Sequence, residues 1–244
     1  DIYTLSHHDA LPIFAGTIST TNAAVNFGTA GTVTVPAALT ISSGTGTITL
    51  AAATLSDGVT LTLGDGSNAA VSLASVTGTA LGTTSDIALA TTGTVAASGA
   101  IGTDIGNLSL GATVLAMGAN PLTVGGNISR TSGAITSTGT VTLEGTSAQA
   151  VSFTGSTLAT LAVANTGAVT NTGSLSVTAF TKTLAGTFTL GGTDTMSVAT
   201  SFTASAGTVT MTGAYAGGAA SFTVNGGTVA VGTNAFAAGA MVVS

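Results

Sequence analysis

Apolar and hydroxyl residues alternate along most of this chain in one five-residue phrase, Gly-Thr-apolar-Thr-apolar. Full copies start at Gly31, Gly46, Gly139, Gly186 and Gly207, and looser copies start at Gly58, Gly93, Gly173 and Gly227. Because side chains alternate faces along a β-strand, each copy places two apolar residues on one face and two hydroxyls on the other, while the glycine supplies the turn. The pattern predicts a succession of short strands, each with one dry side.

The copies recur at unequal intervals, for example 15 residues from Gly31 to Gly46 and 21 residues from Gly186 to Gly207. Strands separated by such turns predict coils of about 18 to 22 residues with two or three strands each. We therefore expect an all-β fold, a parallel β-helix (β-solenoid) of about eleven coils, roughly 50 Å long at ~4.8 Å per coil. The alternative is a packed globule of antiparallel hairpins, which needs two-residue Asn-Gly turns, and only Asn225-Gly226 fits that description.

Stacked copies of the phrase define an inside and an outside. The residues expected to point inward are Val33, Val35, Ile48, Leu50, Val141, Leu143, Phe188, Leu190, Val209 and Met211. The residues expected to form an outward ladder are Thr32, Thr34, Thr47, Thr49, Thr60, Thr62, Thr140, Thr142, Thr187, Thr189, Thr208 and Thr210.

Two segments depart from this pattern. Residues 1–14 contain both histidines and resemble the peptide of a translated sequencing adaptor, so we expect them to be an artefact or unstructured leader that packs poorly on the first coil. Residues 15–244 are then a single β-solenoid domain, and because neither end carries a polar capping repeat we expect a fragment with open ends. The stretch 98–122 is the least strand-like and predicts a wider loop or irregular coil.

Charge is scarce. Only 4% of the 244 residues are charged, 44% are hydrophobic, and the formal net charge is -6. With two basic residues, Arg130 and Lys182, the chain cannot neutralise a phosphate backbone, so we expect no nucleic-acid partner. Gly, Thr and Ser interrupt every apolar run, so we expect no membrane insertion. Arg130 is expected at a turn and Lys182 outward on a strand, because burying an unpaired ammonium is costly.

The segment from Val141 to Ala199 includes V-T-L-E-G-T-S-A-Q-A-V-S-F, then L-A-T-L-A-V-A-N-T-G-A-V, and continues through G-T-F-T-L-G-G. It resembles the repeats of large secreted bacterial surface proteins, the filamentous-haemagglutinin-like and autotransporter-passenger-like β-helix adhesins. The resemblance implies a right-handed parallel β-helix displayed outside a bacterial cell. It also implies contacts with glycans or proteins on host or neighbouring-cell surfaces, and with flanking coils of the same parent chain.

The acidic residues give little indication of a catalytic or metal site. A β-helix lyase or hydrolase, the main alternative function, needs two or three carboxylates on one face. Asp57 and Asp65 are the one pair that could meet across adjacent coils, and a third acid beside them in a cleft would favour the enzyme. The turn L-G-D-G-S-N around Asp65 fits an Asx turn better than a calcium site. With no cysteine, and both histidines in residues 1–14, we expect no enzyme, no catalytic residue, no cofactor and no metal.

The outward T-x-T pairs are also the kind of surface with which ice-binding β-solenoids order water. Such a surface needs a flat face in constant register. Here the intervals vary, and the stretch from Gly93 to Pro121 lacks the pair. β-Propensity accounts for threonine on an exposed strand without any ligand. The sequence therefore favours a stalk or broad adhesive surface, with the enzyme and the ice-binding face as alternatives.

Overall fold

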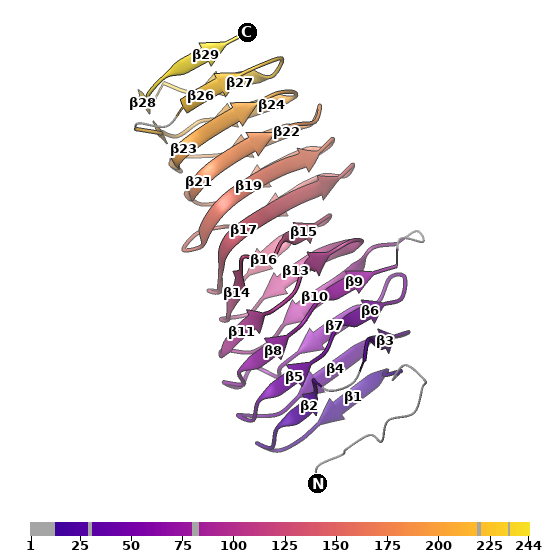
Figure 1. Cartoon of the computed structure of the whole chain (residues 1–244). Helices are drawn as coiled ribbons and strands as arrows, with labels where there is room; N and C mark the ends of the chain where they lie inside the picture. The colour runs from indigo at the N-terminus through magenta and orange to yellow at the C-terminus, as the bar shows by residue number, and fades with distance from the viewer. Residues whose placement is uncertain (1–12, 29–30, 80–82, 219–220, 234) are drawn as a thin grey trace.

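The computed structural model describes residues 13–28, 31–79, 83–218, 221–233 and 235–244. Its strands follow one another around a common axis, and the coils stack from β1 at one end to β29 at the other (Figure 1). Each coil turns through three faces. All the strands within the described residues pair in parallel, so the antiparallel hairpin alternative is wrong and the β-solenoid is confirmed.

Face 1 is the 11-stranded sheet, one strand per coil, which agrees with the predicted eleven coils. Its strands are β1 (Gly16–Ser19), β4 (Leu39–Ser42), β7 (Thr60–Leu63), β10 (Ser85–Leu89), β13 (Ile105–Leu110), β16 (Ile128–Arg130), β18 (Gln149–Val151), β20 (Ala168–Asn171), β22 (Thr187–Leu190), β24 (Thr208–Met211) and β27 (Thr228–Val231).

The second, 18-stranded sheet bends around the other two faces. Face 2 contains β2 (Val25–Phe27), β5 (Ile48–Leu50), β8 (Val71–Leu73), β11 (Thr94–Ala97), β14 (Val114–Gly118), β25 (Tyr215–Ala216) and β28 (Phe236–Ala237). Face 3 contains β3 (Val33–Val35), β6 (Ala53–Leu55), β9 (Val76–Gly78), β12 (Ile101–Gly102), β15 (Leu122–Val124), β26 (Ser221–Val224) and β29 (Met241–Val243). Four long strands run from face 2 onto face 3: β17 (Ala134–Gly145), β19 (Thr157–Asn165), β21 (Leu175–Lys182) and β23 (Met196–Ala204).

The apolar residues of the repeated phrase form the interior, as predicted. All ten residues expected to point inward are buried, each at most 1% exposed. Towards the last coils the interior becomes aromatic: Phe180, Phe202 and Phe222 stack above one another, with ring centroids 5.1 and 4.3 Å apart. Because pairing is in register, each inward residue packs on its counterpart in the next coil, and the core is a set of columns along the axis.

The stretch 98–122 is more regular than the sequence indicated. It carries β12, β13 and β14, so the expectation of a loop or irregular coil is wrong. The alternation persists there with other residues: Leu108 and Leu110 point inward, while Asn107 and Ser109 are exposed. The corner before β13 is unusual, because the non-glycine residues Thr103 and Asp104 both have positive φ.

The prediction for residues 1–14 falls almost entirely on residues 1–12, which lie outside the described part of the chain. Of the two that are described, Ile13 is 69% exposed. Phe14 packs its ring on Phe27, with centroids 4.5 Å apart, and donates its N–H to the carbonyl of Thr34. None of the described residues forms a helix long and apolar enough to cross a membrane.

The corners between faces bring backbone from neighbouring coils into close contact. A Cβ at Gly207 would overlap the carbonyl oxygens of Gly186 and Leu184, and Gly207 also has φ +70°. At Gly191, in another corner, a Cβ would meet nothing within 4 Å.

We expect Gly207→Ala to lower the free energy of unfolding by about 1–3 kcal/mol, because the new methyl group forces both a strained φ and a displaced coil. Gly191→Ala is the matched control, and its expected effect is small or slightly stabilising, within about 1 kcal/mol. Urea unfolding followed by circular dichroism measures both. Equal effects of the two substitutions would contradict this account of the corners.

Candidate functional site

The T-x-T pairs identified in the sequence lie outward, but on three different faces. Each of the twelve threonines is half-buried or exposed. Face 1 carries the pairs at 60 and 62, at 187 and 189, and at 208 and 210, in β7, β22 and β24. Face 2 carries 47 and 49 at β5, while face 3 carries 32 and 34 at β3 and 140 and 142 in β17. The twelve residues therefore do not form one ladder.

Face 3 carries a longer row that the repeated phrase did not reveal. We call it the threonine column: Thr34, Thr54, Thr77, Thr123, Thr142, Thr181, Thr203 and Thr223. Consecutive strands pair these positions directly, with Gly102 between Thr77 and Thr123, and Ala162 between Thr142 and Thr181. The column thus runs along one face of the solenoid from β3 to β26, interrupted at two positions.

Unequal coil lengths do not disturb this register. Paired positions on face 1 are 19 residues apart at Val169 and Phe188 but 26 apart at Thr60 and Asp86. The difference is absorbed at the corners, since on face 3 the residues Thr34, Thr54 and Thr77 stay aligned. The inference that irregular intervals break the register is therefore wrong. The gap noted from Gly93 to Pro121 is real, because Gly102 interrupts the column there.

Six of the threonines in the column lie outside the full copies of the phrase, and for this reason they were missed. A usable signal was present in the sequence: several stand between an inward apolar residue and another inward residue, as in F-T-K, F-T-A and F-T-V around Thr181, Thr203 and Thr223. Counting the centre of such triplets, rather than the Gly-Thr start, would have found the column.

The acids are spread over corners and faces. Asp57 and Asp65 lie at opposite ends of β7, so the structure does not bring this pair together. Asp57 is instead the charged neighbour of Asp104, whose pKa is raised by burial and, secondly, by that carboxylate. Within the described ranges, no group of three or more His, Asp or Glu side chains gathers as a metal-ligand set.

Asp65 occupies an Asx turn, as the sequence suggested. Its Oδ1 accepts the backbone N–H of Ser67 at 3.0 Å. Hydrogen bonds from the side chain and backbone of Ser67 hold the pKa of Asp65 below its ordinary value. A further exposed row links coils on face 1, because Asp86 Oδ1 accepts the N–H of Asn107 at 2.7 Å and Asn107 Oδ1 accepts the N–H of Asn127 at 2.9 Å. These polar side chains have structural partners.

Lys182 is inside the solenoid, and the expectation that it points outward is wrong. Its side chain is 0% exposed. After a register shift between Val177 and Ala179, β21 alternates with Phe180 inward, so Lys182, two residues on, is inward as well. The ammonium donates to the backbone carbonyls of Asn165, at 3.2 Å, and Leu184. The other basic residue, Arg130, ends β16 next to a bend, close to its expected turn.

Lys182 belongs to a file of buried polar side chains at the corner between face 3 and face 1. One coil earlier Asn165 donates to Gln149 Oε1 at 2.8 Å and to the carbonyls of Glu144 and Ser147. Gln149 in turn donates to the carbonyls of Val124 and Gly126. Gln149, Asn165 and Lys182 thus donate hydrogen bonds to backbone carbonyls at this corner, where strand pairing ends.

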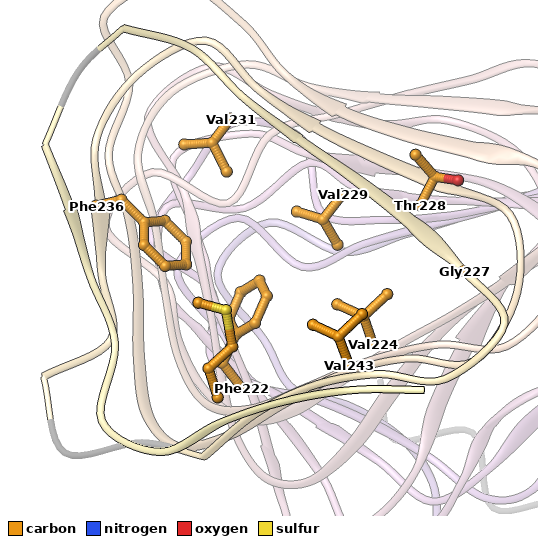
Figure 2. Close-up of a pocket in the computed structure, with 9 residues that line it drawn as sticks. Phe222, Val224, Gly227, Thr228, Val229, Val231, Phe236 and Val243 are labelled. Carbon is orange, nitrogen blue, oxygen red and sulfur yellow. The ribbon is translucent and has the colours of Figure 1, made fainter.

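The interior is accessible at the last coil. A cavity of about 380 Å³ lies at this end of the core. Figure 2 shows Phe222, Phe236 and Val243 around it. Met241 and Val243 are 57% and 71% exposed, whereas their counterparts in earlier coils are buried. The cavity continues the apolar core and is lined mainly by apolar side chains.

Comparisons of the chain with models of known protein families, with curated proteins and with solved structures gave no match.

Burial lowers the pKa of Lys182. The folded state therefore releases this proton at a lower pH than the unfolded chain, whose lysine pKa is about 10.4. The cost of the buried charge is fully present below the lowered pKa and disappears as pH rises towards 10.4, so Lys182 makes stability increase with pH across that window.

We define the gap as the free energy of unfolding of Lys182→Met minus that of the native chain, and we expect it to be about 1–3 kcal/mol more favourable to the variant at pH 7 than where Lys182 is neutral, because methionine avoids the cost of the buried charge. The variant also leaves the carbonyls of Asn165 and Leu184 without their donor, but that loss is present at every pH. The gap should shrink at pH 10. Urea unfolding of both proteins at the two pH values measures it. Tyr215, whose pKa burial raises to about 12, is common to both proteins and cancels in the difference. A gap that does not change with pH would contradict a buried ammonium.

Proposed function

We propose that this chain is a structural and adhesive segment of an extracellular bacterial β-helix surface protein, serving as a stalk and as a broad contact surface. The observation that carries the proposal is the stack itself: parallel coils from β1 to β29 around one apolar core, with outer faces made almost entirely of small uncharged residues. The resemblance of residues 141–199 to secreted adhesin repeats supports the same class of protein.

The stalk role is supported by the way the coils are joined. Each coil contributes one strand to face 1, and the inward side chains of neighbouring coils pack in register. In such an array every coil is held by its two neighbours, so length can grow without a larger core. The spread of the acids also favours this role over the carbohydrate-active enzyme, since Asp57 and Asp65 do not meet in a cleft with a third acid.

The contact role is supported by the threonine column. A hydroxyl both donates and accepts, so a row of threonines can bind the polar surface of a glycan or protein without a charged partner. Each such hydrogen bond is worth only about 0.5–1.5 kcal/mol net, because water competes for it. Adhesion would then depend on many weak contacts repeated along the face.

Adhesion measurements on face 3 test this proposal. We expect beads coated with the whole chain to adhere to glycan-bearing cell surfaces. The triple variant Thr54→Glu, Thr123→Glu, Thr203→Glu should lower adhesion severalfold, because desolvated carboxylates disrupt an uncharged contact. The three sites lie several coils apart, which limits repulsion between the new charges.

The matched control places the same three charges on face 1, as Thr40→Glu, Ser109→Glu and Thr170→Glu. These side chains also lie outward on strands. Circular dichroism checks that both variants keep the fold. No adhesion by the native chain would remove the contact role, and equal loss in both variants would remove face 3 as its location.

A second candidate, ice binding, is favoured by one observation: the threonine column keeps its register over the coils of face 3 despite unequal coil lengths. A regular row of hydroxyls and methyl groups, without charge, is the surface that this function needs.

If face 3 binds ice, the native chain should inhibit ice recrystallisation and separate the freezing from the melting temperature of its solution. The face 3 triple variant should lose most of this effect, and the face 1 variant should keep it. Ice growth in the presence of each protein, observed in a nanolitre osmometer, is the measurement. Absence of any effect from the native chain would reject ice binding while leaving the adhesive role intact.

A further inference from the structure

The turn 225–227 joins β26 on face 3 to β27 on face 1, near one end of the stack (Figure 1). It contains Asn225-Gly226, the one Asn-Gly pair in the sequence. Because β26 pairs with β23 and β27 pairs with β24, this dipeptide is not a hairpin turn. It lies instead at a corner, with both residues exposed to solvent.

An asparagine that precedes glycine can lose its amide without an enzyme. The backbone nitrogen of the glycine gives its proton to hydroxide and forms a bond to the asparagine Cγ. The Cγ–Nδ2 bond then breaks, and ammonia leaves with a proton taken from water. Water opens the resulting succinimide ring at either carbonyl, which gives aspartate or isoaspartate. Glycine favours ring closure because it has no Cβ to hinder the approach of its nitrogen.

The structure leaves both reacting groups of this pair accessible. Asn225 donates its backbone N–H to the carbonyl of Ala204 at 2.9 Å, but its carboxamide has no hydrogen-bond partner among the described residues. The N–H of Gly226 lies 3.4 Å from the carbonyl oxygen of Ser244, longer than the usual limit of about 3.2 Å for such a bond. Neither the leaving amide nor the attacking nitrogen is therefore held firmly.

Other asparagines lack one of these two features. Asn107 is held by its side chain, because its Nδ2 donates to both carboxylate oxygens of Asp86, at 3.1 and 3.2 Å. Asn68 is exposed and makes no side-chain hydrogen bond within the described ranges. The residue after it is Ala69, which has a Cβ and is fully buried. Asn68 thus differs from Asn225 in the following residue, and Asn107 differs from it in both respects.

We propose that Asn225 is a site of spontaneous deamidation in the folded protein, where it is converted to aspartate or isoaspartate. The proposal does not depend on the adhesive function. Either product places a carboxylate on an outer surface that carries few charges, two residues beyond Thr223 of the threonine column.

Isoaspartate also lengthens the backbone at this corner, because the chain then continues through Cβ and Cγ and gains a main-chain atom. The corner packs closely on the preceding coil. A Cβ at Gly227 would lie 2.8 Å from the carbonyl oxygen of Ala204, and a Cβ at Gly226 would lie 3.0 Å from that of Ser205. A longer main chain therefore displaces the turn, and we expect the adjoining end of β27 to open more often.

The test is incubation of the whole folded chain at pH 8 for several weeks, followed by chymotrypsin digestion and mass spectrometry of the asparagine-containing peptides. We expect conversion at Asn225 to be at least about tenfold faster than at Asn68 or Asn107, because Asn225 combines a following glycine with an unbonded carboxamide. Labelling by an isoaspartate methyltransferase identifies isoaspartate. Anion exchange separates the converted protein by its added charge, and amide hydrogen exchange in β27 should be faster in that fraction.

Two variants and one condition serve as controls. Asn225→Ser removes the reacting amide and should prevent the appearance of the more acidic species. Gly226→Ala keeps the amide but adds a Cβ beside the attacking nitrogen, so it should slow conversion about tenfold. Circular dichroism shows whether both variants are folded. Incubation of the native chain in urea gives the rate of conversion without the fold.

The proposal is overturned if Asn225 in the folded chain reacts no faster than Asn68 or Asn107. It is equally overturned if Asn225→Ser acquires the same acidic species, or if folding slows conversion at Asn225 by more than about tenfold relative to urea, since the fold would then protect the pair. Unchanged hydrogen exchange of β27 in a fraction that contains isoaspartate would contradict the predicted displacement of the corner.

Discussion

The backbone hydrogen bonds between parallel strands of successive coils are the interaction on which the rest of this structure depends. They place each residue directly above its counterpart one coil away, so that inward and outward positions become columns along the axis. The stacked rings of Phe180, Phe202 and Phe222 and the threonine column are two consequences of this single constraint, one inside and one outside. A shift of one residue along a whole strand would turn apolar side chains outward, so most of the length variation lies at the corners, and the bulge at the start of β10 and β13 leaves Ile87 and Leu108 paired and inward.

At the corners, the backbone groups need hydrogen-bond partners other than the paired strands. Strand pairing ends there, and coils approach too closely for side chains at positions such as Gly207. Carbonyl groups left inside need donors, and Gln149, Asn165 and Lys182 provide them in consecutive coils. Lys182 shows how strong the constraint is. The alternation set by Phe180 places an ammonium in the interior, and carbonyl oxygens rather than a carboxylate accept its hydrogen bonds.

The sequence was sufficient to predict the fold and the inward positions, because alternation between apolar and hydroxyl residues has the period of a strand and repeats along the chain. Prediction from the sequence failed where the preference of a single residue was given more weight than the two-residue period of the strand. Lys182 was expected outside from the cost of burying charge, although its spacing from Phe180 already indicated the opposite. The strands of 98–122 were missed because Asn107 and Ser109 replace threonine at outward positions. The threonine column was missed because six of its members lie outside the Gly-Thr phrase, although the triplets around Thr181, Thr203 and Thr223 marked it. Which of these threonines become neighbours depends on the lengths of the turns, and the sequence alone does not align the coils.

The surface that results contains few charges and many hydroxyls, and this combination limits what it can do. With so few charges, long-range electrostatic attraction of a partner is weak, so association relies mainly on direct contact. Each hydroxyl gains little over water, so a useful affinity requires many of them in register. The threonine column has this property, because strand pairing aligns Thr181, Thr203 and Thr223 on successive coils. Because each coil contacts only its two neighbours, further coils can extend such a row of hydroxyls without altering the coils already present, so the number of weak contacts can grow with the length of the solenoid.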